Sequence, residues 1–167
     1  MTVEFAEEHR MVLDLVEKFV ENELMPFEKV VMEREASGEK AGLLPEEEAL
    51  LFEKCKELGL FALDAPEEMG GSDLPATVML AICEKLWSTV TPFTFPPDSP
   101  NLLMLDAVAT PEQKKMYMEP YAKGEMKSCI AISEPGAGGD PAQMKTRAVK
   151  DGDDWVINGR KIWGSNV

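Results

Sequence analysis

The sequence is poor in the residues that most often bind metal ions. Its 167 residues include a single histidine, His9, and three widely spaced cysteines, Cys55, Cys83 and Cys129. No two cysteines have the CxxC spacing of a zinc site, and His9 has no cysteine or second histidine near it in the sequence. We therefore expect no metal site and a solvent-exposed histidine on a helix. Because each cysteine lies in an apolar segment, we expect three reduced core thiols in a cytoplasmic protein.

Long apolar runs and basic clusters are absent as well. A membrane-spanning helix needs about eighteen or more consecutive apolar residues, and the sequence has no such run. Its N-terminus also lacks the basic and apolar regions of a secretion signal. There are 31 acidic residues against 17 basic ones, a formal net charge of −14. Because no apolar run is long enough, we expect no membrane span. Because a surface of this sign repels phosphate backbones, we expect no nucleic-acid partner.

The first three quarters of the chain, residues 1–125, are typical of an all-α domain. Apolar residues recur at intervals of three and four over 3–24, which predicts an amphipathic helix that ends near Pro26. Further helices are expected over 27–36, 45–58, 75–90, 101–108 and 111–122. The last of these begins with a capping box, Thr110 to Gln113, that has proline at its first helical position. We expect a turn at Gly70-Gly71, and four prolines exclude regular structure over 91–100.

The pattern changes to that of β-structure in residues 126–167. Strands are expected over 127–133, 145–150, 155–157 and 160–163. Asp151-Gly152 predicts a turn, and Asn158-Gly159 predicts a hairpin turn between the last two strands. A hairpin and one more strand do not bury a sheet face. The fold class is therefore mainly α, followed by the beginning of an antiparallel β domain that a longer polypeptide or a partner chain completes.

A glycine-rich loop lies where the two parts meet, in the stretch AISEPGAGGDPAQMKT at 131–146. Gly136, Gly138 and Gly139 let the backbone approach a ligand closely and present N–H groups to an anion. The loop lies between two predicted strands, so it is not the strand–loop–helix fingerprint of dinucleotide binding, and it lacks the GK[ST] of a P-loop. From these residues alone, a tight turn and a ligand-binding loop are equally open.

Two linked motifs resemble the signature of a known family of flavoenzymes. The stretch CIAISEPGAGGDPAQMKTRAV, followed by DGDDWVINGRKIWGSN, is similar to that of the acyl-CoA dehydrogenases. The segments 57–71 and 110–125 also resemble that family. The resemblance implies an all-α N-terminal domain, a middle β domain and a C-terminal four-helix bundle, of which this chain covers the first and the opening of the second. It further implies FAD-dependent oxidation of an acyl-CoA to the 2-enoyl-CoA, with electron-transferring flavoprotein as acceptor and a dimer or tetramer at full length.

The resemblance also implies which residues contact the flavin. Ile130, Ile132 and Ser133 would line the isoalloxazine and ribityl region. Gly138 and Gly139 would lie alongside the pyrophosphate of FAD, and Gly139 would also lie near the substrate. Trp163 would pack on the ring, and Gly164 and Ser165 would follow it, with the Ser165 hydroxyl near N5. The family's catalytic base is a glutamate of the C-terminal domain, so no catalytic residue is expected in this chain. We interpret Glu134 as a structural residue that ties down the loop.

The sequence departs from the family pattern at two of these positions. Serine is common where this chain has Gly139, so one hydroxyl contact to the cofactor or substrate is lost. Threonine is common at Ser165, where the hydroxyl is kept. Two alternatives stay open: a flavoenzyme resembling acyl-CoA oxidases, and a flavin-free assembly subunit of the same fold. The isolated chain is expected to bind FAD weakly or not at all and to be inactive.

Overall fold

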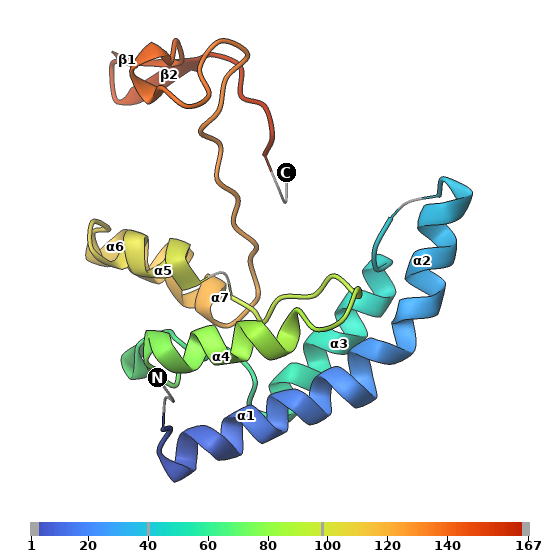
Figure 1. Cartoon of the computed structure of the whole chain (residues 1–167). Coiled ribbons are helices and arrows are strands. Elements are labelled where there is room, and N and C mark those ends of the chain that lie inside the picture. The colour runs from blue at the N-terminus through green and yellow to red at the C-terminus, as the bar shows by residue number, and fades with distance from the viewer. Residues whose placement is uncertain (1–3, 40, 98, 165–167) are drawn as a thin grey trace. The chain divides into compact units, whose positions relative to one another are not determined.

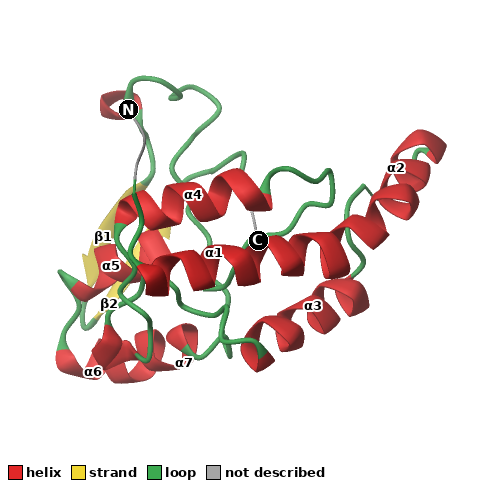
Figure 2. Ribbon diagram, turned by 60° about the horizontal axis from the view of Figure 1, so that its bottom comes forward, coloured by secondary structure: helices red, strands yellow, loops and turns green. Residues whose placement is uncertain are grey.

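The computed structural model describes residues 4–39, 41–97 and 99–164. At 99–101 it describes the backbone alone. The chain forms two compact units, Met1–Met126 and Lys127–Val167, which we call the helical unit and the β unit. Both β-strands belong to the second unit, and the α-helices belong to the first (Figure 1, Figure 2). The chain is therefore mainly helical and ends in the beginning of an antiparallel sheet, as the sequence predicts.

The helical unit begins with one long helical path. Helix α1 (Glu7–Phe19) continues through a π-helical segment (Val20–Leu24) and a 3-10 turn (Met25–Phe27) into α2 (Glu28–Ser37). The second helical piece predicted over 27–36 is thus present as α2, and Pro26 lies in the 3-10 turn that precedes it. Proline lacks an N–H, and the change of hydrogen-bond spacing from π to 3-10 lets the chain pass this residue without a break. The path ends at Gly38, which adopts the left-handed conformation with φ +76°.

The remaining helices are shorter and follow the predicted order. They are α3 (Pro45–Glu57), α4 (Ala76–Leu86), α5 (Ser99–Asp106), α6 (Pro111–Gln113) and α7 (Glu119–Ala122), with a 3-10 turn at Glu67–Met69 and a π-helical segment at Lys114–Met118. The predicted capping box at the start of α6 is confirmed. The Gln113 amide donates to the Thr110 hydroxyl at 3.3 Å, and the Thr110 amide donates to the Gln113 side chain at 2.9 Å.

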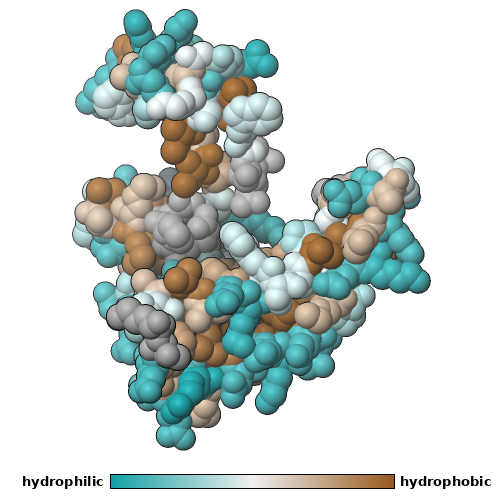
Figure 3. Space-filling model, viewed as in Figure 1, coloured by the Kyte–Doolittle hydropathy of each residue, from teal (hydrophilic) through white to brown (hydrophobic). Residues whose placement is uncertain are grey.

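Two hydrophobic clusters form the core of the helical unit. In the first, α1 and α4 pack side by side, with Val16, Phe19 and Ile82 almost fully buried (Figure 1, Figure 2). The second joins Ala62 and Ala65 to Leu102, Met118 and Tyr121. Hydrophilic side chains cover the outer face of α1 (Figure 3), as expected for an acidic amphipathic helix.

The expectation of three core cysteines is wrong for two of them. Cys55 on α3 is fully buried, and burial raises the pKa of its thiol to about 12. Cys83 lies on the outer face of α4 and Cys129 in the extended segment that opens the β unit, and both are exposed. The error has one cause: an apolar neighbourhood in sequence does not say which side of an element faces the core. His9, expected to be exposed, is half-buried.

The β unit contains one hairpin, and its register differs from the prediction. Strand β1 (Arg147–Asp151) pairs antiparallel with β2 (Asp154–Asn158), so that Val149 lies opposite Val156. The turn uses Gly152 at φ +62°, which confirms the predicted Asp151-Gly152 turn. The predicted Asn158-Gly159 hairpin turn is wrong, because Asn158 is the last residue of β2. Instead, the backbone of Gly159 lies against Thr146, whose Cα would be only 2.7 Å from a side-chain Cβ at Gly159.

Two of the predicted strands are not formed. Neither residues 127–133 nor residues 160–163 form a strand. A strand requires a neighbour to satisfy its backbone groups, and the described residues of this unit provide one hairpin alone. Every residue of β1 and β2 is exposed. The hairpin thus buries neither of its faces, in agreement with the expectation of an incomplete β domain.

Candidate functional site

The residues that the family resemblance singles out all belong to the β unit. The structure describes seven of the eight: Ile130, Ile132, Ser133, Gly138, Gly139, Trp163 and Gly164. Ser165 lies outside the described residues. Ile130 and Ile132 are exposed to 48% and 55%, although isoleucine is usually buried. Hydrophobic side chains are visible on the extended segment that leads into this unit (Figure 3). The segment thus offers exposed apolar side chains to a ligand or to another part of a larger protein.

Glu134 closes the turn that follows this segment. Its amide donates to the Ala137 carbonyl at 3.0 Å, and the Ala137 amide donates back to the Glu134 carbonyl at 3.1 Å. The side chain points inward and the residue is only 6% exposed. Its two carboxylate oxygens accept hydrogen bonds from the amides of Lys145, at 2.6 Å, and Thr146, at 2.9 Å. The expectation that Glu134 ties down the loop is therefore confirmed.

The surroundings of Glu134 keep it ionised. The Thr146 hydroxyl, the Lys145 amide and the Lys161 ammonium lower the pKa of this carboxyl from 4.5 to about 2. The hydroxyl lies beside the carboxylate, but among the described residues it makes no hydrogen bond of good geometry. A lowered pKa means that the turn gains stability above pH 4.5 and loses it as the pH falls toward 2. A carboxylate this acidic is a poor base near neutral pH.

Lys161 joins the two sequence motifs. Its ammonium donates to the Glu134 carboxylate and to the Ile132 carbonyl, both at 2.9 Å. One residue later, the Ile162 amide donates to the Ser133 carbonyl at 2.9 Å. Neither Lys161 nor Thr146 was among the site residues predicted from the sequence. The available signal was Glu134 itself, since a carboxylate that ties down a loop requires donors and a cation.

Trp163 follows directly after these contacts and has an unusual conformation. Its φ is +61°, in the left-handed region that bulky residues rarely adopt. Its side chain is 87% exposed, the largest exposed fraction among the large hydrophobic side chains of the described residues. Backbone strain of this kind costs about 1–3 kcal/mol and is concentrated at functional sites. Packing within the described part of the chain does not explain it.

The loop glycines are free of internal constraints. At Gly136, Gly138 and Gly139 an added Cβ would meet no atom within 4 Å, and none of the three has a left-handed φ. In the described part of the chain, the amides of Gly138 and Gly139 donate to no other group. Gly71 and Gly159 differ, because the backbone or a neighbouring residue occupies the space of their missing side chains. Nothing inside the described chain therefore requires glycine in the loop, whereas close approach by a ligand would.

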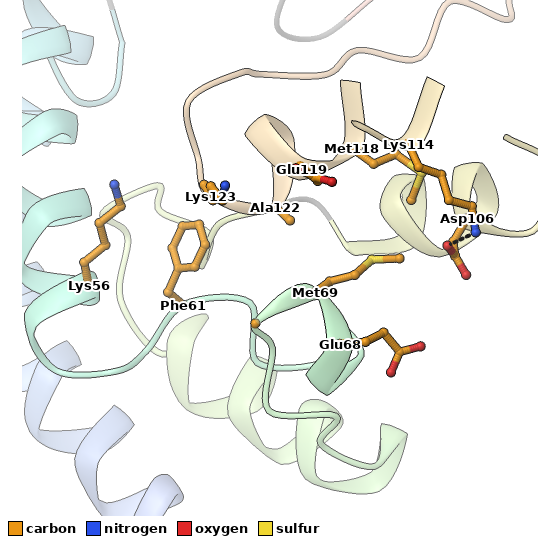
Figure 4. Close-up of a pocket in the computed structure, with 11 residues that line it drawn as sticks. Lys56, Phe61, Glu68, Met69, Asp106, Lys114, Met118, Glu119, Ala122 and Lys123 are labelled. Atoms are coloured by element: carbon orange, nitrogen blue, oxygen red, sulfur yellow. Dashed lines mark hydrogen bonds and ion pairs between the residues drawn. The ribbon is translucent and has the colours of Figure 1, made fainter. Parts of the chain in front are cut away.

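The helical unit has a cavity of its own that the sequence analysis did not predict. It measures about 810 Å³, and Phe61, Met69 and Met118 form apolar parts of its wall (Figure 4). Charged groups surround them, including Lys114, which pairs with Asp106 at 2.6 Å. The wall carries the same number of lysines as of carboxylates, so its charges favour neither an anion nor a cation.

The described residues contain no metal-binding cluster. No group of three or more histidine, cysteine or carboxylate side chains is placed to hold an ion within the described ranges. Among the helices described, none is long and apolar enough to cross a membrane.

Comparison with known families identifies the chain. The sequence model described as "Acyl-CoA dehydrogenase, N-terminal domain" matches residues 6–125, and that described as "Acyl-CoA dehydrogenase, middle domain" matches residues 129–167. The chain belongs to the acyl-CoA dehydrogenase family. The boundary between the two matched regions, at 125–129, coincides with the boundary between the helical unit and the β unit, which lies between Met126 and Lys127.

Two curated acyl-CoA dehydrogenases illustrate how much of the family the chain spans. It is 36% identical to (R)-benzylsuccinyl-CoA dehydrogenase of Thauera aromatica, over 98% of this chain and 42% of that protein. It is 33% identical to the human short-chain specific acyl-CoA dehydrogenase of mitochondria, over 99% of this chain and 39% of that protein. The chain thus spans about two fifths of the length of these relatives.

Solved acyl-CoA dehydrogenase structures have the same fold. One is a putative acyl-CoA dehydrogenase from Mycobacterium abscessus, with a TM-score of 0.81 and 27% identity over 97% of this chain and 43% of that one. Another is an acyl-CoA dehydrogenase from Bacillus anthracis complexed with FAD. Its TM-score is 0.70, with 28% identity over 98% of this chain and 27% of that one.

The β unit of this acyl-CoA dehydrogenase chain fits a flavin nucleotide. Segment 130–133 and Trp163 supply exposed apolar surface of the kind that an isoalloxazine ring can cover. The open loop at Gly138-Gly139 supplies unpaired amides and space for a phosphate. These features lie within one unit, and the contacts of Lys161 and Ile162 hold the two motifs together.

Proposed function

We propose that this chain supplies the N-terminal domain and the flavin-side loop of an FAD-dependent dehydrogenase that converts an acyl-CoA to the 2-enoyl-CoA. The observation that carries the proposal is a loop with three glycines that no contact within the described residues requires, in the same unit as the exposed Trp163. We refer below to the completed protein, meaning this chain together with the polypeptide or partner chains that complete its β domain.

The residues of the chain would perform three tasks in this reaction. When bound, FAD supplies the acceptor for the hydride that leaves Cβ as the α-proton is removed. The Ser133 hydroxyl and the backbone N–H groups of 130–133 would donate to the pyrimidine edge, where negative charge develops. Trp163 would cover the ring and exclude water, and the amides of Gly138 and Gly139 would bind the pyrophosphate.

The catalytic base comes from outside this chain in our proposal. Glu134 is unsuited to that role, because its oxygens already accept hydrogen bonds and its pKa is about 2. Acyl-CoA as substrate, electron-transferring flavoprotein as electron acceptor and assembly into a dimer or tetramer are parts of the proposal that rest on the family. Three free cysteines are compatible with the reducing cytoplasm that we propose as its location.

The test is anaerobic addition of a set of acyl-CoA thioesters to the completed protein. We expect loss of the visible absorbance of oxidised flavin with at least one thioester, because hydride transfer reduces the ring. Release of peroxide in air at a rate equal to substrate oxidation would instead identify an oxidase. A folded, colourless protein that takes up no added FAD would identify a flavin-free subunit and contradict the proposal.

The isolated 167-residue chain is expected to bind FAD with a Kd well above 1 µM, on the order of 100 µM or weaker. Every residue of β1 and β2 is exposed, so neither face of the hairpin packs against another element of the described chain. The β unit therefore lacks the packing that would hold a binding site rigid. Isothermal titration of the chain with FAD measures this affinity. A Kd of about 1 µM or below would show that the site is complete without the rest of the fold.

Substitution of Gly139 by serine is expected to tighten FAD binding by the completed protein about fivefold. The structure leaves open space for the added side chain, and the φ of Gly139 suits any residue. A hydroxyl that bonds the cofactor contributes about 1 kcal/mol, which corresponds to this factor. The control is Gly139→Ala, which adds a methyl group without the hydroxyl. Equal affinities of the two variants would show that a serine at this position makes no contact with FAD.

A further inference from the structure

The ammonium of Lys161 uses its full capacity for hydrogen bonds. It has three N–H donors and three acceptors: the Glu134 carboxylate, the Ile132 carbonyl and the Met144 sulfur, at 2.9, 2.9 and 3.5 Å. The group is partly buried, and its carboxylate partner is almost fully so. An ion pair in such surroundings is screened little by solvent, so the attraction between its charges is stronger than at the surface.

The contacts of Lys161 and Ile162 act on two consecutive carbonyls. The side chain of Lys161 binds the carbonyl of Ile132, and the backbone amide of Ile162 binds that of Ser133. Successive carbonyls of an extended chain point in opposite directions. Held at both, segment 132–133 is fixed in position and also in rotation about its own axis. That rotation determines which side chains and amides of 130–133 form the exposed edge.

Glu134 anchors the same arrangement from a third segment. Its carboxylate accepts from the amides of Lys145 and Thr146, just ahead of β1, as well as from Lys161. The three segments 132–134, 144–146 and 161–162 thus meet at one carboxylate–ammonium pair. Trp163 directly follows Ile162, the last residue that makes these contacts. The position of Trp163 relative to Ser133 therefore depends on the pair of Lys161 and Glu134.

We propose that Lys161 and Glu134 are positioning residues that set the edge of segment 130–133 and Trp163 in the geometry that FAD requires. The proposal rests on the proposed function. The proposal explains why the two sequence motifs occur together: the Lys161 ammonium of the second motif aligns the backbone of segment 132–134 in the first. Arginine would not replace Lys161, because a planar guanidinium cannot direct its donors at three acceptors arranged around a single point.

The experiment compares four variants in the completed protein with bound FAD. Lys161→Met removes the ammonium at similar volume, Lys161→Arg keeps the charge, and Glu134→Gln removes the anion. Lys150→Met is the matched control, since Lys150 is an exposed lysine of β1 outside the three joined segments. The measurements are the Kd for FAD, the visible spectrum and reduction potential of the bound flavin, and the thermal midpoint of the FAD-free protein.

We expect Lys161→Met to bind FAD about tenfold more weakly and to shift the flavin spectrum and potential. Lys161→Arg should keep the thermal midpoint and still show an altered spectrum, which a purely structural role would not produce. Lys150→Met should match the wild type. If Lys161→Met does not fold, Lys161→Arg carries the test alone. Unaltered flavin affinity and spectrum in folded Lys161 variants would overturn the positioning role, whereas absence of FAD from the wild type would overturn the proposed function.

Discussion

Replacement of Trp163 by alanine is expected to weaken FAD binding by the completed protein about 30-fold. The indole is 87% exposed, and among the described residues it has no packing partner that would explain its left-handed backbone. Covering one face of a flavin with an indole contributes about 2 kcal/mol from buried apolar area and ring stacking. That free energy corresponds to the expected factor in Kd. Alanine is about as strained as tryptophan at φ +61°, so the substitution removes the ring and leaves the backbone strain in place.

Trp155 provides a matched control for this substitution. It lies on β2 in the same unit and is also largely exposed, at 62%. The family resemblance gives it no contact with the flavin. Trp155→Ala should therefore leave the Kd for FAD within about twofold of the wild type, as judged by fluorescence titration of the FAD-free completed protein. Equal losses in both variants, or none in Trp163→Ala, would contradict the position assigned to Trp163.

Replacement of Gly71 by alanine is expected to lower the free energy of unfolding of the chain by about 3 kcal/mol. A Cβ at this position would lie 2.5 Å from the Ala65 carbonyl carbon and 2.7 Å from the Ala62 carbonyl oxygen. Both are backbone atoms of a buried segment, so the clash cannot be relieved by turning a side chain. The Asp73 amide, which donates to the Ala65 carbonyl at 2.9 Å, would be displaced with it.

Urea unfolding followed by far-UV circular dichroism measures this loss. Gly139→Ala is the matched control, because its added methyl group meets open space and its backbone conformation suits alanine. We expect that control to stay within about 0.5 kcal/mol of the wild type. A Gly71→Ala variant as stable as the control would mean that the loop after α3 does not pack as closely as described.

The helices could be predicted because their signals are local. The capping box at Thr110 and Gln113 lies within four residues, and apolar periodicity alone places α1, α3 and α4. The β unit was harder, since a strand exists only with a neighbour. Two turn signals competed there, at Gly152 and at Gly159. The first forms the hairpin, and the second is used for close contact with Thr146, which no local pattern reveals.

The candidate site shows the same division between local and distant information. The motif predicted the loop, and the role of Glu134 in tying down the loop was predicted correctly. Its partner Lys161 lies 27 residues away, and no spacing rule connects the two. The strain at Trp163 is likewise invisible in sequence, because no local pattern specifies a left-handed backbone at a tryptophan.

Flavin content measures the role of this chain most directly. Purified completed protein is incubated with excess FAD, desalted, and assayed for bound flavin per chain by absorbance after denaturation. We predict one FAD per chain in the wild type and clearly less in Trp163→Ala, because in our proposal the open glycine loop, segment 130–133 and Trp163 form one side of the flavin site. A folded wild-type protein that retains no FAD, or a Trp163→Ala variant that retains it as tightly as the wild type, would contradict this assignment.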